Sequence, residues 1–322
     1  MPKESRYKPP RSISRARAEA QYARPHGSKK LARRRNIAGA GFLAPGLAIL
    51  AVFVFYPTFY AFGLSFTNAS GFKAPEWQGF ANYARVFTDA DTRGAVLHTL
   101  QYAIGYAPLV IIVALLMAML LNRKDIPFRG FFRTVIFLPF IISMAVAALS
   151  WSFLIDANTG IIPYWFSQIF HTQMPDLLHD TFWAMPTVIF VAVWKNFGYF
   201  MVIFIAGLQG IPRDLYEAAE IDGASAWQRF WSVTLPGLRS TMTYVIILAA
   251  TGAFQAFDQI YIMTKGGPSR TTETIVYRVY TEGFTNFRQG YASSLAFILM
   301  LITMVVGVIQ LTINKRQERD LV

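Results

Sequence analysis

The stretch Glu217–Pro236 reads EAAEIDGASAWQRFWSVTLP and places charged residues inside an otherwise apolar C-terminal half. Upstream of it, Pro212 suits the first turn of a helix, because the N–H that proline lacks would be unpaired there. Asp214 and Glu217 lie early in that helix, where negative charge favours the positive end of the helix dipole. Gly223 can adopt the left-handed conformation that ends a helix.

A second short helix is expected directly after this glycine. Ser225 can cap a helix over Ala226–Val233, and Pro236 is expected to end it. The stretch therefore predicts two short helices that meet at a glycine, on the surface of a bilayer and not inside it.

The composition around this stretch is that of a membrane protein. Of the 322 residues, 54% are hydrophobic and 15% are charged, whereas soluble domains have about 25% charged residues. The net charge of +12 lies mostly in one tail and in loops. The chain has no cysteine, which excludes a disulfide, a thiolate nucleophile and a cysteine-based metal site.

Six apolar stretches are each long enough to cross a bilayer, because a hydrocarbon core of roughly 30 Å needs about 20 helical residues. They are residues 37–66, 95–121, 134–155, 181–208, 240–264 and 290–313. The strands of a membrane barrel would be shorter and would alternate polar with apolar residues. The sequence therefore predicts an all-α integral membrane protein with six transmembrane helices.

The distribution of lysine and arginine predicts the orientation of these helices. The N-terminal tail, the loops around 123–133 and 213–239 and the C-terminal tail lie on one side and together hold 22 of the 30 basic residues. By the positive-inside rule, both termini and the Glu217 loop are expected to be cytoplasmic. Residues 1–36 are expected to be mostly disordered and to contact anionic lipid. Nucleic-acid binding is not expected, because no recognition fold accompanies the charge.

The stretch that contains Glu217 resembles the EAA loop of ABC-importer permeases. The residues at the spacing of that motif are Glu217, Ala218, Ala219, Gly223, Val233, Leu235 and Pro236, with valine where isoleucine is usual. The run Asp222, Gly223, Ala224 resembles the sugar-importer branch. Further resemblances are RTVIFLP at 133–139, TKGGP at 264–268 and GYAS at 290–293. The resemblance covers about residues 40–314 and points to maltose- and glycerol-phosphate-type permeases.

This resemblance implies a type I ABC importer permease fold in the cytoplasmic (inner) membrane, with a sugar as substrate. The implied partners are a second homologous permease subunit, two ABC ATPase subunits, an extracytoplasmic sugar-binding protein and membrane lipid. ATP would be bound by the partner subunits, so this chain is expected to need no cofactor. The implied organisation is a tail at 1–36, the first helix and outer loop at 37–94, a permease core at 95–314 and a C-terminus at 315–322. Within the core, the coupling loop is 209–236, and its expected ATPase-contacting residues are Glu217, Ala218, Ala219, Asp222, Gly223, Leu235 and Pro236.

Motifs of catalysis are missing from the sequence. There is no GxxxxGK[ST] pattern for ATP, and no GxSxG or HExxH pattern. The four histidines show no metal-ligand spacing. The sequence therefore predicts a chain that is not an enzyme and holds no metal.

Polar residues within the apolar stretches are candidates for the substrate path. An ionisable side chain at mid-membrane costs roughly 2.5–3.5 kcal/mol on insertion scales and tends to face a protein interior. Thr251, Gln255 and Asp258 stand at i, i+4 and i+7, which predicts one face of the fifth helix. On the fourth helix Lys195 and Tyr199 share a face, and Asn196 is adjacent. The alternative is that these groups hydrogen-bond between helices or to a partner.

Two further function classes remain open from the sequence. An ion-coupled secondary transporter or channel often shows inverted repeats and carboxylates near the bilayer midplane. Here Asp258 is the only acidic residue within an apolar stretch, and it lies near one end. A membrane scaffold with a nucleic-acid-binding tail is the other alternative.

Overall fold

The structure is a computed structural model that describes residues 29–71 and 74–319. The chain divides into two units, residues 1–59 and 60–322. The predicted tail lies outside the described residues up to position 28, and so do the last three residues of the C-terminus.

The first unit contains α2 (Lys29–Leu50), a π-helical turn η1 (Ala51–Phe55) and the start of α3 (Tyr56–Leu64). Residues 36–64 form one helical segment that is long and apolar enough to cross a membrane. The helix already begins at Lys29, inside the tail for which the sequence predicted disorder. Lysine, alanine, leucine and arginine favour helix, so the helix extends beyond the apolar run in the N-terminal direction.

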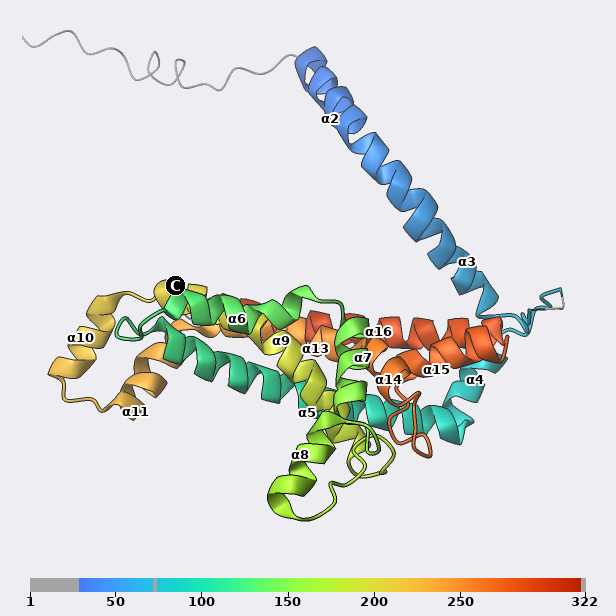
Figure 1. Cartoon of the computed structure of the whole chain (residues 1–322). Coiled ribbons are helices and arrows are strands. Elements are labelled where there is room, and N and C mark those ends of the chain that lie inside the picture. The colour runs from blue at the N-terminus through green and yellow to red at the C-terminus, as the bar shows by residue number, and fades with distance from the viewer. Residues whose placement is uncertain (1–28, 72–73, 320–322) are drawn as a thin grey trace, which may run out of the picture. The chain divides into compact units, whose positions relative to one another are not determined.

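The second unit contains three further helices that are long and apolar enough to span, and Figure 1 shows them among its other elements. They are α5 (Ala90–Asn122), α9 (Ala184–Gln209) and α16 (Gln289–Arg319). Two bent helix pairs also qualify, so the described residues contain four to six candidate spans. The first pair is α6 (Arg129–Ile141) and α7 (Met144–Leu154), and the second joins residues 226–237 to α13 (Arg239–Phe254).

Short helices make up the remaining elements of the second unit. They are α4 (Ala81–Thr88), α8 (Ile161–Phe170), α10 (Arg213–Ile221), α11 (Ala226–Arg229), η2 (Phe230–Thr234), α12 (Leu235–Gly237), α14 (Asp258–Met263), α15 (Ile275–Tyr280) and η3 (Thr281–Thr285). Among the described residues the only pairing of extended backbone is an isolated bridge between Thr67 and Trp77. The all-α prediction is therefore confirmed for this part of the chain.

The core of the second unit lies where α5, α9 and α13 pack together. Val110 and Ala114 of α5 and Val191 of α9 are fully buried. Gly198 of α9 lies directly against the backbone of α6, since a Cβ at this position would be 2.9 Å from the carbonyl carbon of Ile136. Only glycine permits this close approach, which fixes α6 beside α9.

The third predicted helix, 134–155, is not continuous. Its two halves, α6 and α7, meet at an angle of 97°. Ile142 is extended, and Ser143 starts α7 by accepting a hydrogen bond from the N–H of Val146 at 3.3 Å. A serine N-cap thus begins a new helix inside an apolar run.

The fifth predicted helix, 240–264, is also interrupted. α13 ends at Phe254 and α14 begins at Asp258. The N–H of Gln255 bonds to the carbonyl of Gly252 at 3.2 Å, which tightens the last turn and ends the regular helix. The prediction that Thr251, Gln255 and Asp258 share one helical face is therefore wrong, because no single helix contains all three.

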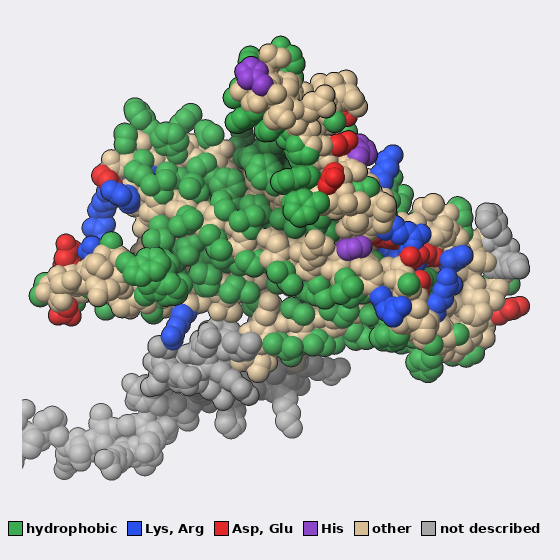
Figure 2. Space-filling model, turned by 90° about the horizontal axis from the view of Figure 1, so that it is seen from below, with side chains coloured by type: hydrophobic (Ala, Val, Ile, Leu, Met, Phe, Trp, Pro, Cys, Tyr) green, Lys and Arg blue, Asp and Glu red, His purple; other side chains and the backbone are tan. Residues whose placement is uncertain are grey.

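Charged and apolar side chains separate on the surface of the molecule. In Figure 1, α10 and α11 lie at one end of the second unit, and α4 and α15 lie at the other. We call these the α10 end and the α15 end. Figure 2 shows hydrophobic side chains over the middle of the visible face and most charged side chains toward the two ends. This is the distribution expected of a bundle whose middle contacts lipid.

Candidate functional site

A cavity of about 420 Å³ lies between α5, α6, α9 and the break between α13 and α14. From α9 it is lined by three residues that the sequence singled out, Lys195, Asn196 and Tyr199. Gln255 and Asp258 line it from the break. The cavity is therefore bordered by the middle of a candidate span and by helix ends inside the bundle.

Thr251 is the one predicted pathway residue that does not line this cavity. The break after Phe254 leaves Gln255 and Asp258 outside α13, so helical spacing no longer relates them to Thr251. The neighbouring Gly252 lines the cavity in its place.

Two stacked tyrosines form part of the cavity wall. The rings of Tyr102 and Tyr106 on α5 lie 5.6 Å apart and nearly parallel. Gln259 Nε2 donates to Tyr102 Oη at 2.8 Å, and Asn196 Nδ2 donates to Tyr106 Oη at 3.0 Å. These bonds connect α14 and α9 to α5 and fix the orientation of both amides.

Sequence reasoning did not single out Gln259, Tyr102 or Tyr106. The available signal was two tyrosines four residues apart in one apolar stretch, which places them on the same helix face. Their amide partners are 90 and 157 residues away in the chain, and no local pattern relates them.

Lys195 is held by a carbonyl and an aromatic ring. Its Nζ donates to the carbonyl oxygen of Phe140 at 3.3 Å and lies 5.0 Å from the centroid of the Phe140 ring. That ring stacks on Tyr199 with centroids 4.4 Å apart. Within the described residues no carboxylate lies within 4 Å of the ammonium group, so the positive charge remains available to a ligand.

The cavity combines two kinds of chemistry. Phe140 and Tyr199 present aromatic surface, while Lys195, Asn196 and Gln255 supply hydrogen-bond donors. A ligand with many hydroxyl groups and apolar ring faces matches this lining. Among the described residues no cluster of His, Asp or Glu could hold a metal ion.

The loop at the α10 end has the two-helix form that the sequence predicted. Pro212 precedes α10 as its N-cap, and Asp214 lies in the first turn. Gly223 has φ of +76°, which confirms the left-handed conformation expected there. Ser225 caps α11 through a capping box with Gln228, with bonds of 3.3 and 2.8 Å.

The predicted coupling residues lie along this loop in two groups. Glu217, Ala218 and Asp222 are exposed and Ala219 is half-buried, while Leu235 and Pro236 belong to α12. Pro236 therefore does not end the second helix, which continues through the π turn η2 to Gly237. Proline is tolerated here because it stands in the first turn of α12.

Large apolar side chains on the same loop were not predicted to matter. Ile221, Trp227 and Trp231 are 87%, 69% and 53% exposed. Exposed aromatic residues of this size next to a turn are typical of a contact surface for another protein.

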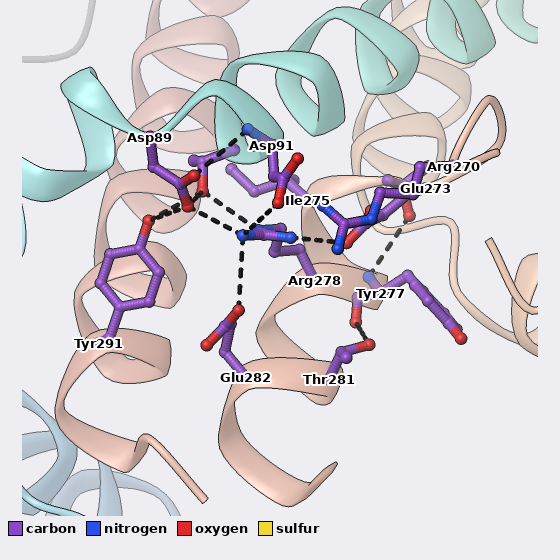
Figure 3. A network of polar contacts seen from close by, with 12 residues as sticks. Asp89, Asp91, Arg270, Glu273, Ile275, Tyr277, Arg278, Thr281, Glu282 and Tyr291 are labelled. Atoms are coloured by element: carbon purple, nitrogen blue, oxygen red, sulfur yellow. Dashed lines mark hydrogen bonds and ion pairs between the residues drawn. The ribbon is translucent and has the colours of Figure 1, made fainter. Parts of the chain in front are cut away.

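A buried ion-pair network lies at the α15 end (Figure 3). The Arg278 guanidinium contacts Asp89 at 2.8 Å, Glu273 at 3.2 Å and Glu282 at 3.4 Å. Its Nε donates to Thr92 at 3.2 Å. One arginine of α15 thereby connects the start of α5, the loop before α15 and the π turn η3.

Asp89 is the member of this network whose acidity changes most clearly. Burial raises its pKa, but hydrogen bonds from Thr92, Arg278 and Tyr291 outweigh that effect and lower the pKa to about 2. The carboxylate is therefore ionised at neutral pH. The network is therefore a structural connection at this end of the unit.

A family model described as "Binding-protein-dependent transport system inner membrane component" matches residues 110–319. The chain belongs to this family. The match begins in α5 and contains the α10–α11 loop, α9 and the helix break that borders the cavity. The chain is therefore an inner-membrane permease, as the EAA-like spacing around Glu217 predicted.

Alignments with several named relatives extend over more than four fifths of this permease. It is 35% identical to the probable ABC transporter permease protein YurN of Bacillus subtilis, over 87% of this chain and 96% of the relative. It is 35% identical to the sn-glycerol-3-phosphate transport system permease protein UgpA of Brucella abortus, over 83% and 91%. It is 30% identical to the lactose transport system permease protein LacF of Rhizobium radiobacter, over 87% and 95%.

A solved structure supports the fold of the permease. It is a bacterial ABC transporter involved in the import of the acidic polysaccharide alginate, with a TM-score of 0.75 and 22% identity. The match covers 88% of this chain and 96% of that one. The predicted ABC-importer permease fold is therefore confirmed.

Proposed function

We propose that this permease forms one half of the membrane pathway of an ABC importer for a sugar or sugar derivative. A second homologous permease forms the other half, an extracytoplasmic binding protein delivers the substrate, and two separate ATPase subunits supply the energy. Relatives named for lactose and glycerol-3-phosphate transport support this substrate class. The observation that carries the proposal is the polar, aromatic-lined cavity bordered by the middle of α9.

In this proposal the cavity contacts the substrate during passage. Lys195, Asn196 and Gln255 donate hydrogen bonds to sugar hydroxyls, Asp258 accepts one, and Tyr199 presents a ring face. Cavity groups that already bond to each other, such as Gln259 with Tyr102, keep the wall in one conformation. A preorganised wall lowers the entropy cost of each transient contact.

The loop of α10 and α11 transmits motion from an ATPase in this proposal, and it lies on the cytoplasmic side together with both termini. The chain itself is non-catalytic and binds no ATP. Glu217, Ala218 and Asp222 offer an exposed polar edge, and Trp227 an exposed apolar one. Leu235 and Pro236 join this surface to α13 through α12, so movement of the loop turns the helix that borders the cavity.

Uptake of radiolabelled substrates tests the proposal. A strain that lacks the gene is complemented with wild type, Gly223→Asp or the control Asp125→Asn, whose carboxylate is exposed and lies outside the coupling loop. The panel contains disaccharides, oligosaccharides and glycerol 3-phosphate. Wild type and the control are expected to restore uptake of one class, and Gly223→Asp is not. Uptake that persists after ATP depletion would instead support an ion-coupled transporter.

Variants of the cavity test the substrate path separately. Gln255→Ala removes one hydrogen-bonding group and is expected to lower uptake roughly two- to tenfold, the equivalent of one neutral hydrogen bond. Thr251→Val is the matched control, since Thr251 does not line the cavity. Equal uptake by both variants at equal membrane abundance would contradict the pathway assignment.

A further inference from the structure

A second cavity, of about 580 Å³, lies at the α10 end of the bundle. Three basic residues line it from three different segments: Lys124 from the α5–α6 loop, Arg129 from the first turn of α6 and Arg213 from the first turn of α10. Glu217 is the only acidic residue that lines it. The cavity therefore carries an excess of positive charge.

None of these cations is neutralised within the described residues. The ion pairs found at this end join Arg123 to Asp125 and Arg229 to Glu220, and neither pair includes a cavity residue. Three unpaired cations around one opening repel each other, and an anion placed between them would remove that repulsion.

The position of the cavity relative to the membrane indicates which kind of anion would bind there. Asn122, at the end of α5, and Leu208 and Gln209, at the end of α9, line the same opening. Both helices are candidate spans, so the cavity lies where apolar helix gives way to polar loop. This is the depth at which phospholipid headgroups lie.

Exposed aromatic side chains are close in sequence to one of the cationic residues, Arg129. Phe128 and Phe131 are 81% and 65% exposed and stand on either side of Arg129 in sequence. A soluble phosphate makes no use of apolar surface beside its binding site. A phospholipid does, because its acyl chains continue from the phosphate.

We propose that this cavity binds the phosphate of an anionic phospholipid, with phosphatidylglycerol as the simplest example. Lys124, Arg129 and Arg213 contact the phosphate oxygens, and the acyl chains lie against Phe128 and Phe131. The bound headgroup lies beside Glu217, at the base of the coupling loop. This site is independent of which substrate the permease transports.

Native mass spectrometry of the full-length chain in non-ionic detergent tests this proposal. Phosphatidylglycerol and phosphatidylcholine are titrated into wild type, into K124Q/R129Q/R213Q and into the control R123Q/R229Q, whose arginines form the two surface ion pairs. A cation near a membrane surface contributes about fivefold in affinity for anionic lipid, so the triple variant should bind phosphatidylglycerol roughly a hundredfold more weakly. The control should bind as wild type does.

Single variants show whether a loss of lipid binding comes from misfolding of the triple variant. Lys124→Gln alters an exposed loop residue and should weaken binding by about fivefold without a change in fold. Unchanged binding by the triple variant, equal loss in the control, or no preference for phosphatidylglycerol would overturn the proposal. Displacement of the lipid by inorganic phosphate at equal concentration would show a site for free anions instead. Loss of ATPase binding with unchanged lipid binding in the triple variant would assign the cavity to the ATPase.

Discussion

Replacement of Arg278 by alanine is expected to destabilise the α15 end more than any other single charge removal described above. Its side chain is 6% exposed, and those of Glu273 and Glu282 are 6% and 3% exposed. Removal of one partner from a buried ion pair costs about 3–5 kcal/mol, because the remaining charge stays buried without compensation.

The remaining contacts set the size of the effect within that range. Glu282 keeps Arg288 at 3.4 Å, and Asp89 keeps the hydroxyl groups of Thr92 at 2.9 Å and Tyr291 at 3.0 Å. The side chain of Arg288 is 51% exposed, so solvent screens its attraction. We therefore expect a loss of about 3 kcal/mol, at the lower end of the range.

The free energy of unfolding, measured by titrating the full-length chain in mixed micelles with a denaturing detergent, checks this value. Arg123→Ala is the matched control, because its pair with Asp125 has side chains 64% and 63% exposed. Loss of such a surface pair should cost less than about 1 kcal/mol. The reasoning is refuted if the two substitutions cost the same. Arg278→Lys, which keeps the charge, should recover part of the loss.

Three further predictions follow from single residues. Acidification should lower the free energy of unfolding, because the folded-state pKa of Asp89 is about 2 against its ordinary value of 3.8. Its contribution is therefore complete above about pH 4 and is lost as the pH falls toward 2, and Asp89→Asn should lack this part of an acid titration. Gly198→Ala should cost about 1–3 kcal/mol in the same assay, since the new methyl group must displace α6, whereas Gly130→Ala, with nothing within 4 Å, should not. Gly223→Ala should cost about 1 kcal/mol because φ is +76°, and a normal ratio of uptake to ATP hydrolysis in that variant would contradict its role in coupling.

Features set by local chemistry were predictable from the sequence. α9 spans Ala184–Gln209 where the apolar run predicted 181–208, because a bilayer requires a run of this length. Gly223 and Ser225 adopt the expected conformations because few residues suit a left-handed turn or a helix cap.

Breaks inside apolar runs were not predictable in the same way. A hydrophobic run shows that a segment lies in lipid or in a core, but it does not show that the helix is continuous. The bend before Ser143 and the gap between Phe254 and Asp258 depend on neighbouring helices that satisfy the freed backbone groups. This is why the expected face of Thr251, Gln255 and Asp258 does not exist.

Contacts between residues far apart in the chain could not be predicted from local sequence patterns either. Asp89 and Arg278 are 189 residues apart, and no local sequence pattern relates them. The fold brings them together because the start of α5 lies beside α15, and seven further charged residues line the cavity at this end. Charge counts predict topology, but they do not predict partners.

The π turn η2 determines how a deletion in this segment would act on the chain. A π turn contains one residue more than an α-helical turn, so deletion of one residue within Phe230–Thr234 would restore ordinary helix. It would also rotate everything before it relative to α13 by about 100°. The direction in which Glu217 and Trp227 would face an ATPase in the proposed function is thus set by a single extra residue, whatever its side chain.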